Sequence, residues 1–149
     1  MTSSLLVVDD DELVLASLTA YLQFSGYVVY PASNSSEALR LANYVLIDLV
    51  VSDLRPMGID GYTLCRELYR LHHIPALLMS GFYENYEFKK AAWDICDFIR
   101  KPFLPNELEN RIRTLLIRVT ASPTGSAFTG TYTNASSNLD CRVISYHLP

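Results

Sequence analysis

The sequence predicts an α/β fold in which a doubly wound parallel sheet has helices on both faces. The first observation is that five short apolar runs are separated by segments of helical length. Such runs are typical of strands that are buried on both sides. The second observation is that polar residues directly follow several of the runs, and open α/β sheets collect their chemistry at the carboxyl ends of their strands. Alternating strands and helices also favour right-handed crossovers.

The first half of the chain is expected to supply three strands and two helices. The strands are predicted at 5–8, 27–30 and 49–52. The first helix is predicted over Glu12–Ser25, and it should stop at Gly26 because glycine readily takes the left-handed conformation that ends a helix. The second helix is predicted to begin after Asn34, with Glu37 placed for a capping box.

The second half is expected to add two strands and three helices. A helix is predicted over 61–72, and Pro75 ends the connection that follows it. The strands are predicted at 76–79 and 97–100, with a helix over 84–93 between them. The last helix is predicted from Pro105, a residue suited to the first helical position, to about Val119.

Composition excludes several classes of protein. The length of 149 residues favours one domain, and a net charge of −4 argues against non-specific nucleic-acid binding. No apolar run reaches the roughly 18 to 20 residues of a membrane-spanning helix, and the first residues lack the basic region of a signal peptide. The odd set of Cys65, Cys96 and Cys141 lacks metal-site spacing, so we expect reduced thiols in the cytoplasm.

The composition changes near the end of the chain, so we expect one domain over 1–119 and a tail over 120–149. Residues 120–138 are rich in Ser, Thr, Gly and Ala, which is typical of a linker or a disordered tail. The stretch 141–148 is apolar enough to form a strand or to dock on another surface. It is too short for a helix-turn-helix output domain.

The residues that follow the strands point to phosphoryl chemistry. Asp9, Asp10 and Asp53 offer carboxylates, which suit a hard divalent cation. Lys101 and Ser80 offer an ammonium and a hydroxyl, which suit a phosphoryl group. Asp53 could itself be the nucleophile, because an aspartate can form a covalent aspartyl-phosphate.

This ordered set resembles the response-regulator receiver domain of two-component signalling. The resemblance runs from about 5 to about 119 and lies in Val8-Asp9-Asp10, Ser52-Asp53, Asp60-Gly61, Ser80-Gly81 and Lys101-Pro102-Phe103. It implies a flavodoxin-like (βα)5 sheet with strand order 2-1-3-4-5.

The resemblance implies a signalling switch rather than an enzyme, with Asp53 as the phosphoacceptor. The donor would be a sensor histidine kinase or a phosphotransfer protein. Mg²⁺, for which Mn²⁺ could substitute, would be bound by Asp9, Asp10, Asp53 and the backbone carbonyl of Arg55. Ser80 and Lys101 would bind the phosphoryl group. Asp11 and Glu12 are expected to cap the first helix instead, because acids favour a helix N-terminus.

The resemblance also implies a conformational switch at Ser80 and Phe98 and a slow rate of autodephosphorylation. Ser80 would move toward the phosphoryl group and let Phe98 rotate, which changes the face made by 84–93, 97–100 and 105–119 and so controls the binding of a downstream protein. Arg55 and Phe82 stand where the family tunes dephosphorylation, and neither can orient an attacking water, so we expect slow autodephosphorylation. Pro56 stands one position earlier than the family's usual proline.

Two alternatives remain open on the sequence. A degenerate receiver would act as a phosphorylation-independent docking module. A phosphatase of the haloacid-dehalogenase type would use Asp9 and Asp11, but Leu13 stands where that family expects Thr or Val.

The expected oligomeric state is a monomer or a weak phosphorylation-dependent dimer, without direct nucleic-acid or membrane binding. Asp97 and Arg111 match an ion pair common in dimers of transcription-factor receivers. Glu87 and Glu107 would face each other at another such position and repel.

Overall fold

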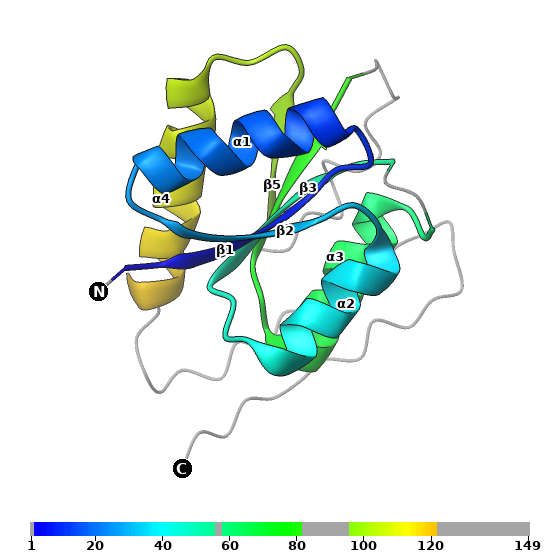
Figure 1. The fold of residues 1–149 in the computed structure, drawn as a ribbon. Helices are drawn as coiled ribbons and strands as arrows, with labels where there is room; N and C mark the ends of the chain where they lie inside the picture. The colour runs from blue at the N-terminus through cyan, green and yellow to red at the C-terminus, as the bar shows by residue number, and fades with distance from the viewer. Residues whose placement is uncertain (1, 56–57, 82–95, 122–149) are drawn as a thin grey trace, which may run out of the picture.

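The computed structural model describes residues 2–55, 58–81 and 96–121, which contain one five-stranded parallel sheet (Figure 1). The strand order is β2-β1-β3-β4-β5, which confirms the predicted topology. The strands are β1 (Ser4–Val8), β2 (Val28–Ala32), β3 (Leu49–Asp53), β4 (Ala76–Ser80) and β5 (Cys96–Arg100). The helices are α1 (Glu12–Phe24), α2 (Ser35–Tyr44), α3 (Gly61–His72) and α4 (Pro105–Ala121).

Helix α4 is the helix that the sequence predicts from Pro105. The helix predicted over 84–93 lies outside the described residues, and so does the chain beyond 121. Within the described part, no helix has the length and the apolar character needed to cross a membrane.

The helices form two layers, with α1 and α4 on one face of the sheet and α2 and α3 on the other (Figure 1). Successive side chains of a strand point to opposite faces, so each strand contributes to two separate cores. The core under α2 and α3 includes Leu6, Val50 and Leu78. The core under α1 and α4 includes Val7, Val51, Leu77 and Ile99.

Short-range signals set the helix starts. The carboxylate of Asp11 accepts hydrogen bonds from the N–H groups of the first turn of α1, at 2.9 and 3.2 Å, which confirms its predicted capping role. Asn34 accepts from the N–H of Glu37 at 2.9 Å, and the Glu37 carboxylate accepts in return from the N–H of Ser33. The predicted capping box is therefore present, with its return bond displaced by one residue.

Strand β2 departs from the prediction, because it starts one residue later than expected and continues through Pro31. The N–H of Val28 donates to Ser3, and the carbonyl of Ala32 accepts from Asp9. Residues 28 and 32 therefore face β1, and Pro31, one position away, faces the free edge of the sheet. The missing N–H of proline costs no hydrogen bond there.

Candidate functional site

The alternation of side chains along the strands brings three charged side chains to the same face of the sheet. Asp9, Asp53 and Lys101 lie at or just beyond the carboxyl ends of β1, β3 and β5. Each follows, by two positions, a residue of the core under α1 and α4, namely Val7, Val51 and Ile99. Because side chains alternate along a strand, all three project toward the face that carries α1 and α4.

The ammonium of Lys101 joins the two carboxylates. Its Nζ donates to Asp53 Oδ1 at 2.9 Å and to Asp9 Oδ2 at 3.1 Å. The side chain of Asp9 is only 3% exposed, and those of Asp53 and Lys101 are 16% and 28% exposed. Few water molecules reach these charges, so their mutual attraction is weakly screened.

Partial burial alone would lower the pKa of the Lys101 ammonium. Hydrogen bonds to Asp53 and Asp9, together with the negative charges of both carboxylates, outweigh burial and raise that pKa above its ordinary value. Lys101 is therefore a fixed positive charge at neutral pH.

Backbone N–H groups orient the two carboxylates. Asp9 Oδ1 accepts from the N–H of Asp11 at 2.9 Å. Asp53 Oδ2 accepts from the N–H of Arg55 at 2.9 Å. Arg55 thus contributes its N–H to the site, a contact that sequence reasoning missed. The role predicted for its carbonyl stays a prediction.

The segment after Asp53 is held by a very close approach of α3. A Cβ on Gly61 would lie 2.1 Å from the carbonyl oxygen of Asp53, which no side chain could tolerate. The N–H of Gly61 donates to the carbonyl of Leu54 at 2.8 Å. Ser35 of α2 holds the same connection, because its hydroxyl donates to the carbonyl of Ile59 at 2.8 Å.

The two residues of the predicted switch lie on one face of neighbouring strands. In the register of β4 and β5, Leu78 pairs with Phe98 and Ser80 pairs with Arg100. Ser80 and Phe98 therefore both face α2 and α3, and Phe98 is half-buried against that core. Phe82 lies outside the described residues.

The donor set fits a hard cation by its chemistry, since Asp9, Asp10 and Asp53 all offer carboxylate oxygens. The described residues do not form a preformed metal-binding site, however. Across 2–55, 58–81 and 96–121, no three acidic, histidine or cysteine side chains gather closely enough to hold a metal ion. Asp10 is exposed, and the cation that Asp9 and Asp53 share is the Lys101 ammonium.

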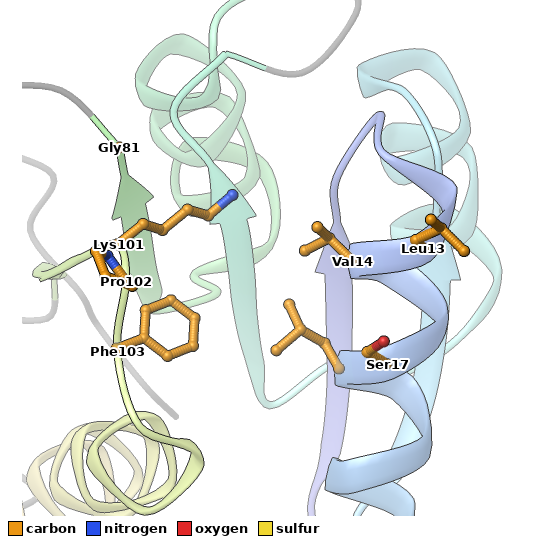
Figure 2. A pocket seen from close by; sticks show the side chains of 8 residues that line it. Leu13, Val14, Ser17, Gly81, Lys101, Pro102 and Phe103 are labelled. Atoms are coloured by element: carbon orange, nitrogen blue, oxygen red, sulfur yellow. The ribbon is translucent and has the colours of Figure 1, made fainter.

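A hollow of about 580 Å³ adjoins Lys101 on the α1 side (Figure 2). Its walls come from the first half of α1 and from the chain around the ends of β4 and β5, and they are Leu13, Val14, Ser17, Leu18, Gly81, Lys101, Pro102 and Phe103. Leu13 is 81% exposed. Sequence reasoning missed this hollow, and an apolar residue on the outer side of an amphipathic helix was the only signal for it.

The pair that was considered as a dimer contact is formed within one chain. Arg111 donates to Asp97 at 2.8 Å, and both side chains are partly exposed. Glu107 accepts from the N–H of Leu104 at 2.9 Å and so caps α4. Glu87, its expected repulsive partner, lies outside the described part of the chain.

The sequence profile of the response regulator receiver domain matches residues 5–113. The chain belongs to this family. Receiver domains are generally signalling modules of two-component systems and generally bind Mg²⁺ at their phosphorylation site.

Relatives of this receiver domain support the assignment. The chain is 34% identical over 117 residues to a probable transcriptional regulator ycf27 of Cyanidium caldarium, with 77% of this chain and 47% of that protein covered. It is 33% identical over 121 residues to the alkaline phosphatase synthesis transcriptional regulatory protein PhoP of Bacillus subtilis, with 79% and 50% covered. The chain thus spans about half the length of these curated relatives.

A solved structure agrees with the observed fold of the receiver domain. A putative response regulator from Chloroflexus aurantiacus shares 33% identity with this chain at a TM-score of 0.70. The match covers 79% of this chain and 100% of the other.

Proposed function

We propose that this receiver domain is a phosphorylation-dependent switch that accepts a phosphoryl group on Asp53 from a histidine kinase or a phosphotransfer protein. The observation that supports this proposal best is the ammonium of Lys101, which lies within hydrogen-bonding distance of both Asp53 and the buried Asp9. A fixed cation beside a strand-end carboxylate is what a phosphoryl acceptor requires, because catalysis of this transfer is mainly positioning and charge neutralisation.

In the proposed reaction, an oxygen of Asp53 forms a bond to phosphorus while the bond between phosphorus and the donor histidine nitrogen breaks. The electron pair of that bond stays on the imidazole. Lys101 offsets the repulsion between the carboxylate and the incoming phosphoryl group, and the N–H of Arg55 keeps the carboxylate oriented. Asp9, Asp10, Asp53 and the Arg55 carbonyl would hold Mg²⁺, which supplies additional positive charge.

The proposed readout begins with the new charge of about −1.5 to −2 on Asp53. Ser80 would donate to the phosphoryl group, and Phe98 would move into the space that Ser80 vacates. Their common face of the sheet supports this coupling. The changed surface would include β5 and α4 and would control the binding of a downstream protein.

We also propose that the phosphoryl group is long-lived. Arg55 is exposed and offers no carboxylate or amide to orient an attacking water, and Phe82 offers none either. The test is the decay of phospho-Asp53 in the natural protein and in the Phe82→Glu variant. Equal decay rates would contradict the proposal.

The first experiment on the switch itself measures intact mass after incubation with Mg²⁺ and acetyl phosphate, for the natural protein and for Asp53→Asn. One added phosphoryl group in the natural protein alone, and only with Mg²⁺, is the expected result. If no group is added, phosphorylated kinase is offered next. Failure of both donors would favour the phosphorylation-independent docking module.

A further inference from the structure

The hydroxyl of Ser35 is a buried polar group to which the proposed reaction gives no role. Ser35 is the first residue of α2 and is only 2% exposed. Its hydroxyl donates to the carbonyl of Ile59 at 2.8 Å, across 24 residues of sequence. Asn34 and Glu37 already cap this helix. The hydroxyl of Ser35 therefore ties the start of α2 to the connection between β3 and α3.

The connection passes close to Ser35 at a second point, one residue before Ile59. Gly58 has a φ of +106°, in the left-handed region that favours glycine. A Cβ built on Gly58 would lie 3.4 Å from both the Cβ and the Oγ of Ser35. The hydrogen bond and this close pass together hold residues 58 and 59 against α2.

Packing alone does not explain a serine at this position. Helices α2 and α3 lie side by side on one face of the sheet (Figure 1), and Ala38 and Leu64 belong to the core that they share. A hydroxyl buried at such a contact costs free energy unless it is hydrogen-bonded, whereas a small apolar side chain would fill the same space without that cost. The bond to Ile59 is what distinguishes Ser35 from an alanine.

A short path leads from Ile59 to the phosphoacceptor. Only Asp60, the N-cap of α3, separates Ile59 from Gly61. The N–H of Gly61 donates to the carbonyl of Leu54, and its Cα lies so close to the Asp53 carbonyl that no side chain fits between them. A displacement of Ile59 would therefore be passed to the backbone of Asp53 through two residues and one direct contact.

We propose that Ser35 is a positioning residue for the reaction at Asp53. It acts through Ile59 and Gly61, because its hydrogen bond holds the start of α3 against the end of β3. The carboxylate of Asp53 is thereby kept where Lys101 and the proposed Mg²⁺ need it. Groups that orient a metal ligand from outside the site contribute strongly to affinity. The inference rests on the proposed function, since it concerns the same carboxylate.

The first test measures the affinity of the full chain for Mg²⁺, in the natural protein and in Ser35→Ala. Backbone amide signals are followed during a Mg²⁺ titration. The substitution removes the hydroxyl and changes the volume of the side chain very little. We expect the dissociation constant for Mg²⁺ to rise about tenfold, the lower end of what the loss of such an orienting partner costs. An unchanged dissociation constant would overturn the proposal.

The matched control is Ala42→Gly, in the last turn of α2 and so at the opposite end of the helix from the connection. Glycine is a poor helix former, so this variant weakens the same helix. It should bind Mg²⁺ as tightly as the natural protein, and urea unfolding reports how much stability each variant loses. An equal loss of Mg²⁺ affinity in both variants would mean that Ser35 acts only through the stability of α2, and would overturn the proposal.

Hydrogen exchange tests the path from Ser35 to Asp53. The N–H of Gly61 donates to Leu54, so its exchange rate reports how firmly the start of α3 is held at the end of β3. We expect this amide to exchange faster in Ser35→Ala than in Ala42→Gly. Equal exchange in the two variants would refute the path.

Phosphorylation by acetyl phosphate separates this inference from the proposed function. At low Mg²⁺ concentration, the initial rate in Ser35→Ala should fall about tenfold, in step with its affinity. At saturating Mg²⁺ the rate should return close to the natural one, because the same carboxylates surround the cation once it is bound. If the natural protein reacts and the variant matches it at every Mg²⁺ concentration, only the positioning role fails. If the natural protein neither binds Mg²⁺ nor takes up a phosphoryl group, the proposed function fails and this inference with it.

Discussion

Polar side chains lie both where the parallel strands begin, here called the amino edge of the sheet, and where the strands end, called the carboxyl edge. Only at the carboxyl edge do they gather around a charged group, the ammonium of Lys101. At the amino edge, Asp48 accepts from the N–H of Ser4 at 2.7 Å, and the Ser4 hydroxyl donates to the carbonyl of Leu46 at 2.6 Å. At the carboxyl edge, Asp9 and Asp53 share the Lys101 ammonium. The amino-edge groups are exposed, whereas Asp9 is almost fully buried.

The two edges differ in how their acidic side chains are balanced by charge, and not in whether an acidic side chain is present. Each edge has an acid next to a strand, but at the amino edge Asp48 Oδ2 accepts only from neutral donors, the N–H and the hydroxyl of Ser4 on a neighbouring strand. At the carboxyl edge, the alternation of side chains along the strands directs Asp9, Asp53 and Lys101 toward the same face of the sheet. Burial there makes the charges rely on one another in addition to the backbone N–H groups of Asp11 and Arg55, which costs desolvation energy and makes the arrangement sensitive to any added charge.

The largest expected effect compares one acid from each edge. Asp9→Asn should lower the rate of phosphorylation of Asp53 by acetyl phosphate on the order of 100-fold, because it removes one of the carboxylates proposed to hold the Mg²⁺ that neutralises the incoming phosphoryl group. Asp48→Asn keeps an accepting oxygen far from that centre and should leave the rate unchanged. Intact mass over time measures both, and a similar loss in the two variants would contradict the distinction.

The next effect tests the close approach at the carboxyl edge. Gly61→Ala places a Cβ against the Asp53 carbonyl and should reduce the free energy of unfolding by about 3 kcal/mol. Gly81→Ala is the matched control, because no atom of the described residues lies within 4 Å of its Cβ position. Urea unfolding measures both changes, and equal small losses would show that α3 moves away without penalty.

A smaller effect is expected from Lys101→Met, which leaves Asp9 and Asp53 without their shared cation. Unfolding free energy should fall by about 1 to 2 kcal/mol, and millimolar Mg²⁺ should restore more of it than it adds to the natural protein. The pKa of Lys101 is raised on folding, so its contribution is fully present below its unfolded pKa of about 10.4. It is lost only as pH rises through the folded value.

The loss should therefore stay constant between pH 6 and pH 9. Urea unfolding at several pH values measures it. A loss that shrinks steadily across this range would mean that another group titrates in place of Lys101.

The smallest effect belongs to the amino edge. Ser4→Ala removes an exposed hydroxyl that hydrogen-bonds to the carbonyl of Leu46 and to Asp48 Oδ2, and it should cost about 0.5 to 1 kcal/mol. Phosphorylation of Asp53 should proceed at the natural rate. A change in that rate would show that the amino edge also influences the reaction centre.

Sequence reasoning succeeded where the signal is local. Helix caps such as Asp11 depend on a few neighbouring residues, and their roles were predicted correctly. The predicted end of β2 at residue 30 was too early, because the strand continues through Pro31, which only an edge strand tolerates without loss of a hydrogen bond. The meeting of Asp9, Asp53 and Lys101 followed from strand order and from the family resemblance.

The remaining features depend on how distant elements pack. The approach of Gly61 to the Asp53 carbonyl needs the final position of α3. The hollow beside Phe103 needs the distance between α1 and the β5–α4 connection. The ion pair of Asp97 with Arg111 needs the rotation of α4, and without it the sequence could not tell a contact within one chain from a contact between two.

The division of the hydrophobic core into two clusters has a consequence for how the sequence can evolve. Leu68 of α3 belongs to the core on one face of the sheet, and Leu115 of α4 belongs to the core on the opposite face. Energetic effects of changes that share no neighbours add almost independently. Mutations in one half therefore need no compensation in the other, so each layer of helices is free to diverge at its own pace in descendants of this chain.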